Sequence, residues 1–110
     1  MFIRCAFFKG TVKEGYQDKF DAYIDAVLVN TWRAFPGAQE VRVLREVESD
    51  NPDIPLELVI AIKFDSRDAI DAALKSPERF DSREKSKKLI DMFDGEVFHT
   101  VFRAEHFPLM

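Results

Sequence analysis

Apolar residues run without interruption through several short segments of this chain. Residues 58–62 include no polar side chain, and Ala6-Phe7-Phe8 and Val101-Phe102 have the same character. A strand that is buried on one face only alternates apolar and polar residues, whereas a strand that is covered on both faces does not. The pattern therefore predicts a sheet with two apolar faces, each of which needs a cover.

The hydrophobic pattern predicts four strands, at about residues 2–9, 39–48, 56–64 and 96–105. The second alternates more than the others and is expected at an edge of the sheet. The third is the most continuously apolar and is expected near its centre. Residues 49–55, which include Pro52 and Pro55, form a turn segment that joins these two strands as a broad hairpin.

A long helix is predicted between the first two strands. Apolar residues recur at helical spacing from about Lys13 to Ala34, and Phe35-Pro36-Gly37 ends the repeat. Thr11 and Glu14 have the spacing of a capping box, so we expect the helix to begin just after Thr11.

A second helical region is predicted between the third and fourth strands, in two parts. Ser66 is a suitable N-cap for the first part, and Ser76-Pro77 is a second start signal. Asp94-Gly95 closes the region, with Gly95 expected as a left-handed C-cap.

The predicted order β-α-β-β-α-β gives one α+β domain over residues 1–110, with a ferredoxin-like four-stranded antiparallel sheet. Right-handed crossovers place both helical regions on one side. Strands about 4.8 Å apart, with roughly seven residues each, leave a little over 400 Å² (about 19 by 23 Å) uncovered on the other side. A patch of that size is near the upper range for a monomer, so we expect a homodimer through the sheet faces.

The charge and the cysteine content of the chain limit which partners and which cellular compartment we expect. The net charge is −4 with both signs interspersed, and no basic stripe indicates nucleic acid. The single cysteine, Cys5, excludes an internal disulfide, and no segment resembles a signal peptide or a membrane span. These features predict a cytoplasmic protein with no nucleic-acid or membrane partner. The 11 phenylalanines suit either a core or the wall of a pocket for an apolar ligand.

The chain resembles a known superfamily in several segments. Residues 64–70, Phe-Asp-Ser-Arg-Asp-Ala-Ile, resemble the strand-to-helix junction of the dimeric α/β-barrel superfamily, which includes antibiotic-biosynthesis monooxygenases. Residues 76–80, 92–95 and 97–99 are most similar to EthD-like members. The resemblance implies a homodimer that forms a dimeric α/β barrel and binds small molecules. It brings no catalytic set with it.

His99 is the candidate catalytic residue. It shares one face of the last predicted strand with Val97, Val101 and Arg103. If that face lines the dimer interior, an apolar cavity and a neighbouring cation favour the neutral imidazole, which can accept a proton. The alternative is a histidine of the core that hydrogen bonds to backbone or to a neighbouring strand.

Arg4 and Arg103 are candidate substrate-binding residues on strands expected to be neighbours. A buried arginine needs an acceptor, which is either an anionic ligand or a carboxylate such as Glu57 or Glu96.

Three aromatic residues are the remaining candidates for substrate binding. Phe8, Tyr16 and Trp32 are expected either to contact a substrate or to pack in the core. Cys5 alternates with Arg4 and is expected to face the helices as a buried thiol.

The chain has neither a nucleotide-binding glycine motif nor a GxSxG motif, and with two histidines and one cysteine we expect no metal and no cofactor. The leading hypothesis is a homodimeric EthD-type protein that binds an apolar or aromatic compound in a cavity near the sheet face, either as a binding protein or as a cofactor-independent oxygenating or proton-transferring enzyme. One alternative is a non-enzymatic accessory dimer whose interior is filled by Phe8, Phe98 and Phe102. Haem ligation by His99 is a minor alternative, implied by haem-binding members of the superfamily.

Overall fold

The segments with two apolar faces form one four-stranded sheet in the computed structural model, which describes residues 1–110. The strands are β1 (Phe2–Val12), β2 (Glu40–Arg45), β3 (Leu56–Phe64) and β4 (Phe93–Arg103). Their order is β2-β3-β1-β4, and each neighbouring pair is antiparallel. The predicted α+β ferredoxin-like fold is confirmed, with the alternating strand β2 at an edge and the apolar strand β3 inside.

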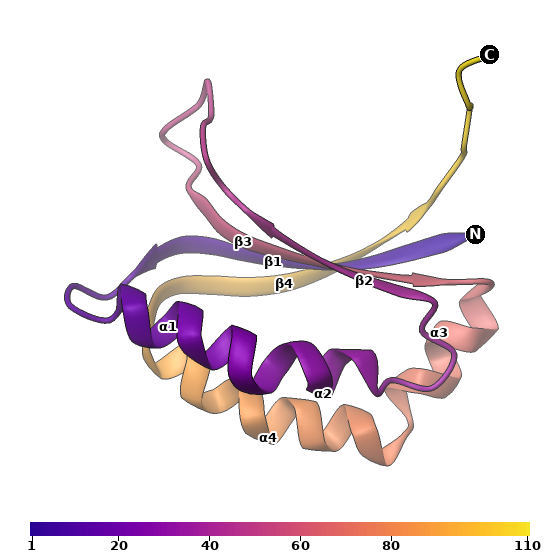
Figure 1. Cartoon of the computed structure of the whole chain (residues 1–110), viewed down its shortest axis with the longest axis horizontal. Helices are drawn as coiled ribbons and strands as arrows, with labels where there is room; N and C mark the ends of the chain where they lie inside the picture. The colour runs from indigo at the N-terminus through magenta and orange to yellow at the C-terminus, as the bar shows by residue number, and fades with distance from the viewer.

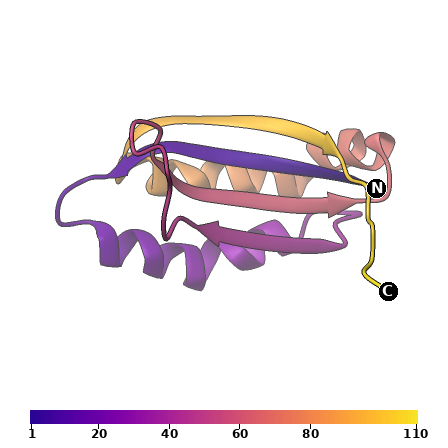
Figure 2. The same cartoon turned by 90° about the horizontal axis from the view of Figure 1, so that it is seen from above.

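All helices lie on one face of this sheet (Figure 1). The first helical segment consists of α1 (Gln17–Tyr23), the π-helical turn η1 (Ile24–Leu28) and α2 (Val29–Arg33). The second consists of α3 (Arg67–Leu74) and α4 (Pro77–Asp91). Figure 2 shows the four strands side by side with the helices beneath them. None of these helices is long and apolar enough to cross a membrane.

The hydrophobic core lies between the sheet and the helices. Six of its large side chains are fully buried: Phe20, Ile24, Leu28, Leu58, Phe64 and Leu89. They come from both helical segments and from β3, so the core joins the two layers along the length of the sheet. Burial of apolar side chains of this size stabilises the fold by roughly 1.5–3 kcal/mol each.

Two of the predicted helix ends are wrong. Thr11 does not cap a helix but pairs with Asp94 in the β1–β4 ladder, and Gly95 lies within β4 opposite Gly10. The ladder supplies backbone hydrogen bonds to more groups than a capping box does, and it extends both strands to their neighbouring turns. In contrast, Ser66 and Ser76 cap their helices as predicted, each accepting a hydrogen bond from a backbone N–H three residues later.

The two faces of β1 have different neighbours. Arg4, Ala6 and Phe8 lie on the helix side, where Ala6 pairs with His99. Cys5 and Phe7 lie on the open side, so the expectation that Cys5 faces the helices is wrong. Strand alternation assigns residues to two faces but does not say which face the helices cover, because both faces of β1 are apolar.

The open face carries an aromatic cluster formed by Phe7, Phe98 and Phe102. The ring centroids of Phe7 and Phe98 are 5.1 Å apart in a stacked arrangement, and Phe102 meets Phe7 edge-on at 6.4 Å. Phe98 and Phe102 remain 41% and 47% exposed. The hairpin between β2 and β3 and the C-terminal segment both rise from this side, away from the helices (Figure 1).

Candidate functional site

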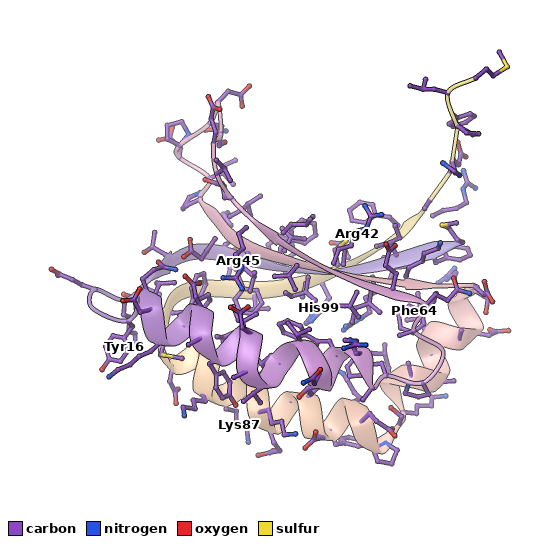
Figure 3. The ribbon with its side chains drawn as sticks, in the orientation of Figure 1. Tyr16, Arg42, Arg45, Phe64, Lys87 and His99 are labelled. Carbon is purple, nitrogen blue, oxygen red and sulfur yellow. The ribbon has the colours of Figure 1, made fainter.

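A pocket of about 600 Å³ lies between the sheet and helices α2 and α4. Strands β1, β3 and β4 contribute its sheet wall, since Ala6, Ile60 and His99 all line it. Figure 3 shows His99 beneath the sheet, on the side of the helices. The expectation that this face of β4 lines a space between two sheets is therefore wrong, and the pocket belongs to a single protomer.

Most of the pocket wall is apolar. Phe8, Ile60 and Ile62 come from the sheet, and Trp32 and Phe35 come from α2 and the segment that follows it. These five side chains are at most 6% exposed, so the core holds them in place. The wall suits the hydrocarbon or aromatic body of a ligand.

Cationic groups gather around His99 in this pocket. Arg4 comes from β1, and Arg79 and Arg83 come from α4, where their spacing of four residues places them on one helix face. Burial, then Arg4 and then Arg79 lower the pKa of His99 from 6.5 to about 4. The side chain of His99 is exposed to solvent, and with a pKa of about 4 it is neutral at pH 7, with a lone pair free to accept a proton.

The two half-buried arginines of the pocket also perturb each other. Burial and then Arg79 lower the pKa of Arg4 to about 10. Burial and then Arg83 lower the pKa of Arg79. Both guanidiniums remain charged near neutral pH, so the pocket concentrates positive charge beside an apolar wall.

No carboxylate of the chain neutralises Arg4 or Arg79. Glu84 is the carboxylate that lines the pocket, and it pairs with Lys87 at 2.9 Å. Glu96 lies 3.9 Å from Lys9, and Glu57 forms no ion pair, so the internal partners considered for Arg4 are not used. Solvent or a bound anion is therefore left as the acceptor for these guanidiniums.

The predicted site residues divide into two groups. Arg4, Phe8, Trp32 and His99 line the pocket together. Tyr16 precedes α1 and is 43% exposed, away from His99 (Figure 3). Arg103 lies outside the pocket and pairs with Glu105 at 3.3 Å.

Sequence reasoning missed the contribution of α4. Arg79, Phe80 and Arg83 line the pocket, yet the sequence around them is strongly charged and reads as a solvent-exposed helix. The signal that could have identified them is the i, i+4 spacing of two arginines beside an exposed phenylalanine, because such a face is half polar and half apolar.

Other reactive groups lie outside this pocket. The Cys5 thiol is buried on the open side, and burial raises its pKa. The chain has no group of three or more His, Cys, Asp and Glu side chains arranged to hold a metal ion.

Comparison with known proteins assigns the fold to a family. Residues 1–85 match the family described as antibiotic biosynthesis monooxygenase (ABM). The chain belongs to the ABM family. The predicted membership of the dimeric α/β-barrel superfamily is thereby confirmed, although the matching family model is ABM rather than EthD.

Solved structures similar to this ABM-family chain include an EthD family protein from Bacillus halodurans, which is 16% identical with a TM-score of 0.76 and covers 96% of this chain and 100% of its own. The cofactor-independent oxygenase SnoaB from Streptomyces nogalater is 20% identical with a TM-score of 0.62, over 96% of this chain and 93% of its own. HapK from Hahella chejuensis is 16% identical with a TM-score of 0.66, over 98% of this chain and 97% of its own. At these identities the similarity concerns the fold. No curated protein matches this chain in sequence.

Proposed function

We propose that this ABM-family protein binds an apolar or aromatic small molecule in the pocket between its sheet and α4, and oxygenates it without a cofactor. The observation that carries the proposal is a neutral His99 beside cationic Arg4 at the end of an apolar pocket. The family description and the oxygenase among the structures of similar fold support the reaction class.

The proposed reaction starts with removal of a proton from an activated CH₂ group or a phenol O–H conjugated with it. His99 accepts the proton, and Arg4 stabilises the negative charge that develops on the conjugated oxygen. The electron-rich carbanion then reduces O₂, and a C–O bond forms to give a peroxide anion. This anion takes the proton back from His99 to become a hydroperoxide, which leaves His99 neutral again. Loss of water breaks the O–O bond and the second C–H bond, so CH₂ and O₂ become C=O and H₂O.

Oxygen uptake tests this proposal. With an electron-rich tricyclic phenol such as dithranol, we expect uptake by the wild-type protein above the uncatalysed rate, with ¹⁸O from ¹⁸O₂ in the product carbonyl. His99→Gln should reduce kcat by 10²-fold or more, the usual contribution of a general base. His106→Gln, in the exposed C-terminal segment, is the matched control. Equal rates for wild type and His99→Gln would refute the catalytic role, and ligand binding without oxygen uptake would favour a non-enzymatic binding protein.

The second part of the proposal is a homodimer formed through the open face of the sheet. The exposed aromatic residues Phe98 and Phe102 support it, because a patch with stacked rings is costly to leave in water. Light scattering at micromolar concentration should give about twice the chain mass of 12.7 kDa. A mass of one chain would contradict this arrangement.

A further inference from the structure

We infer that the ligand of this pocket is an amphipathic carboxylic acid, whose carboxylate is bound between Arg4 of β1 and Arg79 of α4. The inference names the ligand class of the pocket in the proposed function. It depends on that proposal for the use of the pocket, and not for the oxygenation step.

The positive charge of Arg4 and Arg79 is not balanced within the pocket. Arg4 and Arg79 come from different elements, line the same pocket and are both half-buried. Each is close enough to another guanidinium for the two positive charges to oppose one another. Partly buried like charges lower the stability of a fold unless a counter-charge is supplied. A carboxylate placed between them offsets this cost and matches the planar donor fork of arginine.

The other polar groups of the pocket do not compete with an anion for these arginines. His99 is neutral at pH 7, so it supplies no negative charge, and Glu84 is held by Lys87 at 2.9 Å. The pocket therefore contains donors for an anion without an internal anion that competes for them. His99 can hydrogen bond the same carboxylate through its N–H, as a neutral donor.

The rest of the pocket has room for an apolar body attached to the carboxylate. Beyond the arginines, the wall continues as Ile60, Ile62, Trp32 and Phe35, all at most 6% exposed. Phe80 also lines the pocket and is 57% exposed, so an apolar surface continues to the solvent. A volume of about 600 Å³ accommodates a ring system or a branched hydrocarbon in addition to the carboxylate.

A pair of nearly isosteric probes tests the inference. Trp32 is the single tryptophan of the chain and lies in the pocket wall, so its fluorescence reports on occupancy. We expect 4-tert-butylbenzoate to bind at least tenfold more tightly than 4-tert-butylbenzamide by calorimetry at pH 7, because a charge-assisted bidentate contact replaces a neutral one. Equal affinity for the acid and the amide, or binding of neither, would overturn the inference.

Arginine variants locate the contact. Arg4→Met and Arg79→Met should each weaken binding of the benzoate by about 10- to 100-fold and leave that of the benzamide within about twofold. Arg33→Met, which removes an exposed arginine of α2 outside the pocket, is the charge-matched control. Arg4→Lys and Arg79→Lys keep the charge and should restore part of the affinity, which separates anion binding from a folding defect. Unchanged benzoate affinity in both methionine variants would refute the assignment.

The outcomes separate this inference from the proposed reaction. A preference for the acid that depends on Arg4 and Arg79, without oxygen uptake for any substrate, would sink the oxygenase proposal and keep the anion site. Oxygen uptake with no preference for the acid would refute the anion site and keep the oxygenase proposal.

Discussion

Replacing Arg4 with methionine should raise the pKa of His99, and the structure sets limits on the rise. In the folded protein the pKa of His99 falls from 6.5 to about 4, with burial as the largest cause, Arg4 second and Arg79 third. The drop is about 2.5, so the second of three causes accounts for at most half of it, about 1.2. The third accounts for at most about 0.8.

We therefore expect the pKa of His99 to rise in Arg4→Met from about 4 to no more than about 5.2, because methionine preserves the bulk near the ring but removes the charge. The rise in Arg79→Met should be smaller. The charged groups that face the pocket from the packed elements are Arg4 of β1 and Arg79, Arg83, Glu84 and Lys87 of α4. Arg83→Met tests the next cation along α4 and should have less effect than either.

NMR titration of the imidazole C–H signals measures these values directly. The chain has two histidines, and the spectrum of His99→Gln assigns the signals. A pKa of His99 near 6.5 in the wild type, or a larger rise in Arg79→Met than in Arg4→Met, would refute the reasoning.

The same pKa has a consequence for stability. Because the pKa of His99 is lower in the folded state, the unfolded chain binds more protons between pH 6.5 and about 4, and stability falls as the pH is lowered through this range. Urea unfolding of wild type and His99→Gln at several pH values should show a shallower pH dependence in the variant.

Three further perturbations follow from the structure. Arg4→Met should leave the free energy of unfolding unchanged or increase it by about 1 kcal/mol, since a partly buried cation without a partner lowers stability. Urea unfolding measures this free energy, and a loss of more than about 1 kcal/mol would contradict a binding role for the charge. Gly95→Ala should destabilise the fold by about 2–4 kcal/mol, because a Cβ there would lie 2.1 Å from the backbone oxygen of Lys9 at a φ of +155°. Thermal unfolding measures this loss of stability, and an unchanged melting temperature would show that the two strands separate easily at this point. Phe98→Asp should give a monomer by light scattering, because it places a charge in the proposed dimer interface. Benzoate binding should stay within about twofold of wild type, because Phe98 lies on the face away from the pocket. A variant that stays dimeric would contradict the proposed interface.

The sequence specified the architecture because the relevant signals are local. Strand periodicity, two prolines in a turn, and the caps Ser66 and Ser76 each depend on neighbouring residues, and the structure confirms them. The predicted cap at Thr11 failed because a distant segment, the start of β4, pairs with it. Such long-range competition is not encoded in the spacing of Thr11 and Glu14.

The site was only partly predictable for a related reason. Arg4 and His99 are recognisable as candidates in the sequence because a charged or titratable side chain on an apolar strand needs either a partner within the protein or a ligand. Their shared pocket depends on which face the helices cover, and both faces of β1 are apolar. Arg79 and Arg83 escaped notice because the orientation of α4 is set by its packing on the sheet through Leu89, not by its own charged sequence.

The close approach of Gly10 and Gly95 determines which residues of β4 line the pocket. A Cβ on either glycine would come within 2.1 Å of the opposing strand, so no other pair of residues from β1 and β4 can take this place. Sliding β4 by one residue would turn Phe98 toward the pocket and His99 toward the open face. Two glycines at one end of the sheet thus fix the strand register that places His99 in the pocket, four residues away, although neither has a side chain that lines it.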